Sequence, residues 1–411
     1  YATGSYNTFL GSSAGKGGTT SAPYSSGERN TAVGYKALQD FTTGEHNVAI
    51  GYEAAENITT GNYNTVVGYN AYQGATGGSE TVSVGYQAGA VAQGGESVLI
   101  GYQAGYGTSG GSGANGSWNV AIGKQALMSQ RTGARRNVAI GYRSLYRLLD
   151  NGEDSVAIGY ESGLYATGSY NTFVGKDAGK GGTTSAPYSS GQYNVALGAY
   201  AFDSFTSGDD NCIIGRSAGH QINSGDYNVC LGSMAGDNLT TGANNTYLGY
   251  NADCSANSVN DEIVLKAGSD TLVGGGTETI RIGVDSDYIV NDFGENASWS
   301  HSSDRRIKKN IIDNDLGLEF VLKLKTRKFQ KKAPSEYPSE FEQYNPNTTE
   351  RKNPDRVHYG FVAQEVKEAM DSVGHSEFPV WSKQEDGMEL LGESELITPL
   401  VKAVQELTEK N

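Results

Sequence analysis

The sequence has little of what a membrane-spanning, disulfide-rich or zinc-binding protein needs. Its three cysteines, Cys212, Cys230 and Cys254, cannot form a closed set of intrachain disulfides and lack the paired Cys-x-x-Cys spacing of a zinc site. We expect all three cysteines to be small buried side chains, with disulfide pairing between chains as the minor alternative. Because no run of about 18 apolar residues occurs, we predict no membrane insertion.

Positive charge is also scarce. The chain carries 31 Lys and Arg against 46 Asp and Glu, a formal net charge of −15, which argues against nucleic acid as a partner and against an anionic membrane surface. Phenylalanine and methionine are few (11 and 4), whereas glycine (57) and tyrosine (26) are abundant. Glycine without a Gly-x-y period excludes collagen. We predict no metal and no cofactor.

A short motif repeats fourteen times in the first part of the chain. Its frame is Asn-x-x-(Leu/Ile/Val)-Gly-x-x-Ala, as in Asn47–Ala54, and its glycine recurs 16 to 23 residues apart, most often 17. A longer duplication lies over it, since Tyr1–Gly27 returns almost unchanged as Tyr165–Gly191, an offset of 164. Seventeen residues cannot bury a core alone, so the copies must stack on each other.

Each copy predicts a short β-strand. Val48 and Ile50 would share one face of the strand and Ala49 the other. The following glycine can take a positive φ or let a neighbouring backbone approach, and the Asn amide can bond a stacked copy. We therefore predict a mainly β rod of fourteen coils, about 65 Å long at roughly 4.8 Å per coil.

The frame resembles the head repeat of trimeric autotransporter adhesins, Asn-x-Val-Ala-Ile-Gly-x-x-Ser/Ala. This resemblance covers about residues 5–255 and implies a left-handed parallel β-roll that associates as a trimer. The copies here are longer than those repeats, and Thr81, Ser97 and Ser155 stand where Asn is expected.

The composition changes abruptly after residue 302. Residues 1–302 hold 52 glycines with 14 basic and 26 acidic residues, whereas residues 303–411 hold five glycines with 17 basic and 20 acidic residues. This shift predicts a domain boundary. We divide the chain into a β-roll shaft (1–255), a short β stem (256–302) with strands at 262–265 and 278–284, and a C-terminal domain (303–411).

Three motifs of the C-terminal domain resemble the endosialidase-type intramolecular chaperone of phage tail fibres and tailspikes. Residues 303–311 match its Ser-Asp-x-Arg-x-Lys-x-Asn-Ile entry, residues 358–366 its Gly-Phe-Ile-Ala-Gln-Glu-Val signature, and residues 394–407 its closing helix. The resemblance implies an α+β domain that trimerises the chains and then cuts itself off.

The residues themselves predict helix, strand and loop within this domain. Residues 313–315 would cap a helix over 316–322, residues 323–332 would form a strand and residues 336–355 a polar loop. In the last helix an apolar row with spacings of 3, 4 and 3 predicts a coiled-coil contact between chains. The row consists of Ile397, Leu400, Val404 and Leu407.

The resemblance also implies a Ser-Lys pair that cuts the peptide bond before the serine, which maps onto Ser303 and Lys308. The bond would be Ser302–Ser303, cut once per chain. Lys308 must be neutral to accept the hydroxyl proton, which burial or neighbouring cations would favour. The possible supporting residues are Asp304, Arg305, Gln364 and Glu365. The alternative without a catalytic role is that the basic residues around Lys308 form a solvated charged face. Gln364 and Glu365 would then simply lie on a helix surface.

Tyrosine follows the repeat glycine in eight copies, Tyr35, Tyr52, Tyr69, Tyr86, Tyr102, Tyr142, Tyr160 and Tyr250. Stacked, these rings would form a ladder that could bind sugar, although stacking is a sufficient structural reason for them. The long coils at 15–30, 105–118 and 179–194 are better candidates for receptor contact. No carboxylate pair indicates a glycosidase, so no enzymatic activity is predicted for the shaft.

We predict the distal part of a homotrimeric phage or phage-like tail fibre, a virion component assembled in the host cytoplasm. It would bind a host-surface glycan or protein receptor and join the tail or baseplate through a region missing before Tyr1. The alternatives are a tailspike-like polysaccharide depolymerase and a bacterial trimeric surface adhesin. The first predicts sugar release, and the second predicts a C-terminal membrane barrel.

Overall fold

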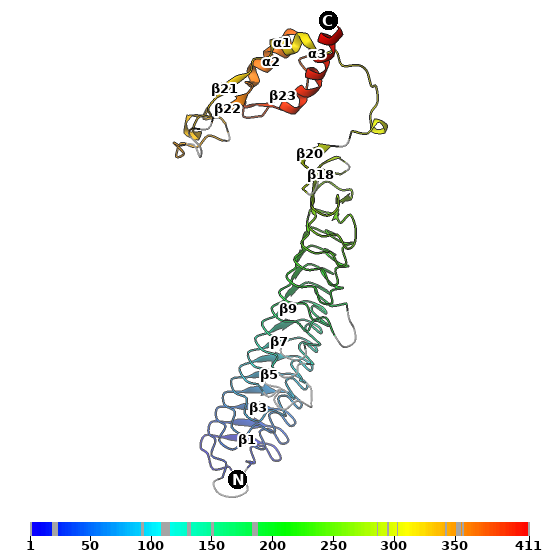
Figure 1. Ribbon diagram of the computed structural model, residues 1–411. Coiled ribbons are helices and arrows are strands. Elements are labelled where there is room, and N and C mark those ends of the chain that lie inside the picture. The colour runs from blue at the N-terminus through cyan, green and yellow to red at the C-terminus, as the bar shows by residue number, and fades with distance from the viewer. Residues whose placement is uncertain are drawn as a thin grey trace. The chain divides into compact units, whose positions relative to one another are not determined.

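The computed structural model divides the chain into two compact units, Tyr1–Ser302 and Ser303–Asn411 (Figure 1). Unit 1 is almost wholly β, and unit 2 mixes three short helices with two small hairpins. The structure describes residues 2–18, 24–91, 94–107, 116–129, 133–148, 152–182, 188–285, 287–293, 296–301, 303–341, 343–350, 355 and 357–409.

Each of the fourteen repeats forms one three-residue strand, which confirms the predicted coil count. Consecutive strands pair in parallel and in register, so that Val48 lies opposite Thr65 and Ile50 opposite Val67. The strands are β1 (Thr8–Leu10), β2 (Thr31–Val33), β3 (Val48–Ile50), β4 (Thr65–Val67), β5 (Val82–Val84), β6 (Val98–Ile100), β7 (Val120–Ile122), β8 (Val138–Ile140), β9 (Val156–Ile158), β10 (Thr172–Val174), β11 (Val195–Leu197), β12 (Cys212–Ile214), β13 (Val229–Leu231) and β14 (Thr246–Leu248).

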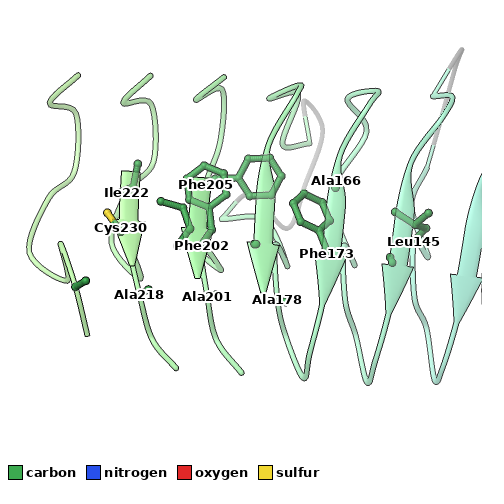
Figure 2. Close-up of a cluster of buried hydrophobic side chains, with 14 of the residues drawn as sticks. Leu145, Ala166, Phe173, Ala178, Ala201, Phe202, Phe205, Ala218, Ile222 and Cys230 are labelled. Carbon is green, nitrogen blue, oxygen red and sulfur yellow. The ribbon is translucent and has the colours of Figure 1, made fainter. Parts of the chain in front are cut away.

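The middle residue of each strand points into the roll, as the period of two predicts. Ala49 is fully buried, Val48 is partly buried and Ile50 is exposed. Large rings fill part of the interior. Phe173 comes from β10, whereas Phe202 and Phe205 come from the turns after β11, and Figure 2 shows all three among small alanines. The interior therefore holds two apolar clusters, one over Ala32–Ala75 and one over Leu99–Leu272, and neither could be closed by a single coil.

A column of asparagines runs through the roll just before the strands. Asn64 donates from Nδ2 to the Oδ1 atom of Asn47 at 2.9 Å and to the carbonyl of Gly78 at 2.9 Å, and its own backbone N–H donates to Asn47 Oδ1. These buried amides satisfy the turn carbonyls that the coil would otherwise leave unpaired. The column ends at the buried Glu262, whose N–H donates to Asn245 Oδ1 at 2.9 Å.

Two of the three cysteines are buried as expected. Cys230 and Cys254 lie inside the roll, where burial raises the pKa of the Cys254 thiol to about 12. The prediction was wrong for Cys212, which is only partly buried. It occupies the first position of β12, and this position points away from the core. All three are free thiols.

The parallel ladder continues beyond residue 255. β16 (Ile263–Ala267) pairs with β14, and β18 (Thr279–Val284) pairs with β16, both in parallel. β19 (Asp287–Asp292) and β20 (Asn296–His301) then add antiparallel strands. A separate two-stranded pairing joins β15 (Ala252–Asp253) to β17 (Leu272–Val273).

Unit 2 packs its helices around a small core that includes Phe320, Met370 and Val380. Its helices are α1 (Leu318–Lys323), α2 (Ala363–Ser372) and α3 (Ile397–Glu409), with 3-10 turns η1 (Arg305–Ile307), η2 (Pro334–Glu336) and η3 (Glu393–Leu396). Its hairpins are β21 (Arg327–Phe329) with β22 (His358–Gly360) and β23 (Trp381–Lys383) with β24 (Glu389–Leu391).

Two local predictions in unit 2 need correction. Residues 313–315 do not cap α1, because the helix begins later, after Gly317. Its first N–H, on Leu318, donates instead to the carboxylate of Glu406 on α3 at 2.9 Å. The strand predicted over 323–332 is limited to β21, Arg327–Phe329, and its first residue, Lys323, is instead the last residue of α1.

Candidate active site

The first residues of unit 2 bring Ser303 and Lys308 together. The 3-10 turn η1 lies between them, and Asp304 caps it by accepting a hydrogen bond from the N–H of Arg306 at 2.8 Å. Because the turn reverses the chain, Lys308 Nζ donates to Ser303 Oγ at 2.7 Å. Both side chains are exposed. The other predicted cleavage residue, Ser302, lies outside the described residues.

A hydroxyl beside an amine is the arrangement that Ser-Lys proton transfer needs. In its neutral form the Lys308 amine could take the proton of Ser303 Oγ, and the oxygen could then attack the preceding carbonyl carbon. An exposed ammonium is well solvated, however, and stays charged until something removes it from water. The structure thus brings the two side chains into hydrogen-bond contact, but it leaves both of them exposed.

Of the two neighbouring arginines, Arg306 is engaged elsewhere. Its guanidinium pairs with the Asp304 carboxylate at 2.7 Å, and this hydrogen bonding is the main reason why the pKa of Asp304 is lowered. Asp304 therefore fixes the turn and also neutralises Arg306. Arg305 is exposed.

The structure does not bring Gln364 and Glu365 into hydrogen-bond contact with Ser303 or Lys308. Both lie in the first turn of α2, where Gln364 is exposed. Glu365 pairs with Arg327 of β21, with Nε to Oε2 at 2.8 Å, and this hydrogen bonding lowers the pKa of the Glu365 carboxyl. In this conformation, Glu365 holds the first hairpin against α2.

Residues 303–375 match the family model described as chaperone of endosialidase. The C-terminal unit carries a chaperone of endosialidase domain. Ser303 is the first residue of the match, so the Ser-Lys pair lies at the entry of this chaperone domain. Comparisons with curated proteins and with solved structures gave no match. None of the described helices is long and apolar enough to span a membrane.

The last helix of the chaperone domain exposes the apolar row that the sequence predicted. α3 turns Pro399 and Ala403 toward its own domain, where both are buried. The row on its other side is exposed to 60% at Ile397, 46% at Leu400, 62% at Val404 and 46% at Leu407. Among the residues that the structure describes, four large apolar side chains at coiled-coil spacing are thus each left about half exposed or more.

The shaft has a second uncovered apolar face. The third strand residue of many coils points outward and is exposed, in the positions of Leu10, Ile50, Ile100, Ile158, Val174, Ile214 and Leu248. Parallel sheets in proteins are almost always covered on both faces. In the part of the shaft that the structure describes, the coil covers the inner face and leaves the outer face partly exposed.

The tyrosines after the repeat glycines form the expected ladder. Tyr52 stacks on Tyr35 and on Tyr69, with ring centroids 5.0 Å apart in both pairs, and Tyr69 stacks on Tyr86 at 5.3 Å. Lys124 stands in the same position, and its Nζ lies 5.5 Å from the centroid of Tyr102. Because neighbouring rings cover both faces of Tyr52 and Tyr69, these rings offer a ligand little more than their edges.

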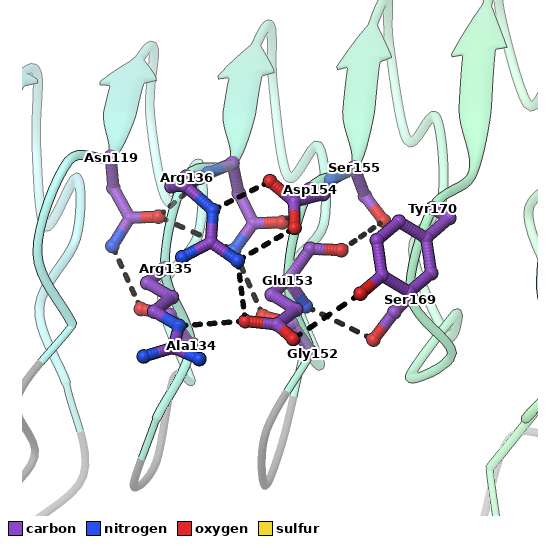
Figure 3. A network of polar contacts seen from close by, with 11 residues as sticks. Asn119, Ala134, Arg135, Arg136, Gly152, Glu153, Asp154, Ser155, Ser169 and Tyr170 are labelled. Carbon is purple, nitrogen blue, oxygen red and sulfur yellow. Dashed lines mark hydrogen bonds and ion pairs between the residues drawn. The ribbon is translucent and has the colours of Figure 1, made fainter.

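A polar network lies on the surface of the middle coils (Figure 3). Arg136 binds both carboxylate oxygens of Asp154 at 2.7 Å, and Arg135 Nε donates to Glu153 at 2.6 Å. Hydrogen bonds from these arginines are the main reason why the pKa values of Glu153 and Asp154 are lowered. The network joins two consecutive coils outside the core.

Arg136→Ala is expected to lower the melting temperature slightly at pH 7, because exposed ion pairs contribute little. The carboxyl pKa values are lower in the folded state, so the contribution is present above the unfolded value and is lost as pH falls through the folded value. The gap between variant and wild type should close below about pH 3. Thermal melts from pH 7 to pH 2 would measure it, and a gap that widens in acid would contradict the assignment.

Proposed function

We propose that this chain is the distal part of a homotrimeric tail fibre of a phage or phage-like particle, and that its C-terminal domain drives trimer folding and then cuts itself off before Ser303. The observation that carries the proposal is the 2.7 Å contact between Lys308 Nζ and Ser303 Oγ. The contact lies at the first residue of the matched domain, directly after a β-solenoid.

The chemistry of the cut follows from this contact. Ser303 Oγ attacks the carbonyl carbon of residue 302, the bond from that carbon to the Ser303 nitrogen breaks, and an ester to Oγ forms. Lys308 accepts the hydroxyl proton, and the Ser303 nitrogen leaves as an amine. Water then hydrolyses the ester, which separates the two fragments and restores the serine hydroxyl.

Two exposed apolar surfaces support the trimer. The α3 row has coiled-coil spacing, and the outer face of the shaft is one uncovered side of a parallel sheet. Packing three copies on these surfaces would remove both from water. If η1 lies against a neighbouring chain in the trimer, assembly would also bury the region around Lys308. Cutting would then occur only after assembly.

The coil geometry explains why such a shaft needs a folding aid. Every coil presents the same pattern, so a chain can pair with its neighbours one coil out of register at little cost. Parallel pairing of distant segments is also slow. A trimeric clamp at one end fixes the register, and its removal afterwards leaves a shaft that unfolds slowly. Host contact completes the proposed role.

The test is the intact mass of purified wild-type chain beside Ser303→Ala and Lys308→Ala. The wild type is expected to give one fragment that ends at Ser302 and another that begins at Ser303, whereas both variants stay whole. Lys309→Ala is the matched control, because it removes an adjacent exposed lysine that makes no contact with Ser303, and it should be cut normally.

Two results would overturn the proposal. If the folded wild-type trimer keeps its full mass, the C-terminal domain is a permanent cap rather than a self-removing one. If Ser303→Ala is cut at the same bond, the nucleophile has been wrongly assigned. Light scattering on each sample separates these cases from a failure to assemble.

A further inference from the structure

The residue immediately before the asparagine position has the same unusual backbone in every coil. Its φ lies between 55° and 63° in all fifteen turns from Tyr6 to Asp261. We call this set the αL column. It consists of Tyr6, Arg29, His46, Tyr63, Glu80, Glu96, Trp118, Arg136, Asp154, Tyr170, Tyr193, Asp210, Tyr227, Asn244 and Asp261.

Aromatic residues occupy six of these fifteen positions. Glycine, asparagine and aspartate are the residues that tolerate a left-handed backbone best, and a bulky side chain there is strained. Burial does not offset the strain here, since the rings are 42% to 79% exposed, with Tyr63 and Tyr227 both at 60%. Contacts between coils account for part of the aromatic choice, since Tyr63 stacks on His46 at 4.8 Å and Arg29 lies 5.4 Å from the centroid of Tyr6. Among the residues that the structure describes, Tyr227 has no such ring or cation partner.

The rings of this column also differ from the tyrosine ladder in what lies beside them. In the ladder, the tyrosine ring of one coil stacks on the tyrosine ring of the next. In the αL column, Tyr227 has Asp210 and Asn244 at the same position of the adjacent coils, and Tyr193 stacks on Tyr170 at 4.9 Å with Asp210 next in line. Figure 3 shows Tyr170 at one end of the charged network. Tyr63 differs from Tyr227 on one side, where it stacks on His46 at 4.8 Å, and on its other side it has Glu80. Each of the two rings thus has an acidic or amide side chain at the same position of at least one adjacent coil.

The two halves of the 164-residue duplication keep this arrangement. Tyr63 corresponds to Tyr227, and the residue before each carries a side-chain oxygen that accepts a hydrogen bond from the preceding coil. Asn62 Oδ1 accepts from the N–H of Glu45, and Asp226 Oδ1 accepts from the N–H of Asp209, both at 2.8 Å. The same ring beside the same kind of acceptor occurs twice on one side of the shaft.

We infer that the αL column is a carbohydrate-binding surface, with equivalent sites centred on Tyr63 and Tyr227. An exposed phenol ring packs against the apolar C–H face of a sugar, and neighbouring carboxylates and amides bond its hydroxyls. The inference rests on the proposed role as a receptor-binding fibre and names the chemistry of the receptor. A neighbouring chain of the trimer would also have to bury the acidic neighbours, Glu80 beside Tyr63 and Asp210 beside Tyr227, at a cost in free energy.

The test uses the double variant Tyr63→Asn, Tyr227→Asn in the full chain. Asparagine suits a left-handed backbone, so the melting temperature and the trimer should be kept or improved while the rings are lost. Binding is measured on a printed array of neutral and sialylated oligosaccharides. The variant is expected to lose about tenfold or more in affinity for whichever oligosaccharide the wild type binds, on the order of 1.4 kcal/mol. Tyr69→Asn, in the stacked ladder, is the control and should bind as the wild type does.

Three results would overturn the inference. In the first, the wild-type trimer binds none of the printed oligosaccharides. In the second, the double variant binds as tightly as the wild type. In the third case the double variant falls apart into monomers, which would make the column a contact between chains. Each is distinguishable from failure of the proposed function, because self-cutting at Ser303 is read by mass in the same samples.

Discussion

Gly68→Ala is expected to destabilise the shaft by at least about 4 kcal/mol and to leave little folded trimer at 37 °C. Gly68 has a φ of 141°, and a methyl group on its Cα would lie 2.3 Å from the carbonyl oxygen of Gly85 and 2.8 Å from its carbonyl carbon. Both contacts are to backbone of the next coil, which is itself held by hydrogen bonds. The neighbouring coils cannot move apart without breaking the parallel ladder.

Gly77→Ala is the matched control for this prediction. It adds a methyl group in the same coil, but Gly77 is exposed, and the nearest atom to the new Cβ is the Thr60 hydroxyl at 3.6 Å. Its stability should stay within about 1 kcal/mol of the wild type. Thermal melts of the two variants and wild type provide the measurement. Equal melting temperatures for Gly68→Ala and wild type would show that adjacent coils are not packed as described.

Leu400→Asp combined with Val404→Asp is expected to abolish assembly. In the single chain both side chains are exposed, at 46% and 62%, so the fold of the domain itself should survive. In a trimer the new carboxylates would be buried near one another, at a cost of several kcal/mol per chain. We expect monomers by light scattering and uncut chains by mass spectrometry, since the proposed cut follows assembly.

Gln405→Asp is the control for the helix variant, because Gln405 is exposed on α3 outside the apolar row. It adds a similar charge to the same helix and should assemble and be cut normally. A cut trimer from the double aspartate variant would show that α3 does not join the chains. Loss of helix content by circular dichroism would show instead that the substitutions had damaged the domain.

Much of the shaft could be predicted because its determinants are local and repeated. The period of two within Val48–Ile50 sets which side chains enter the core, and the glycine spacing counts the coils. The continuation of the parallel ladder into the stem was harder to predict. Glu262 and Lys266 replace the Asn and Gly of the frame, yet the ladder continues through β16 and β18, because backbone pairing tolerates the loss of the motif.

In unit 2, the sequence failed where distant residues decide the local structure. The start of α1 depends on Glu406, 88 residues away from Leu318, and no pattern near residue 315 reveals this. Likewise, Glu365 was predicted as a possible supporting residue for Ser303, but it is hydrogen-bonded to Arg327 on β21. The αL column was missed because the frame begins at Asn, although aligning the copies places Tyr or Trp before it six times.

The one-to-one pairing of coils has a consequence for how such a molecule can change its length. Each residue contacts its equivalent in the coil before and the coil after, so a whole number of coils can be inserted without leaving any partner unmatched. The 164-residue duplication carries β1 onto β10, an insertion of nine complete coils. Unequal lengths between glycines are absorbed by loops outside the ladder. Reach can therefore evolve in steps of one coil, by recombination within the gene, while the packing rules stay the same.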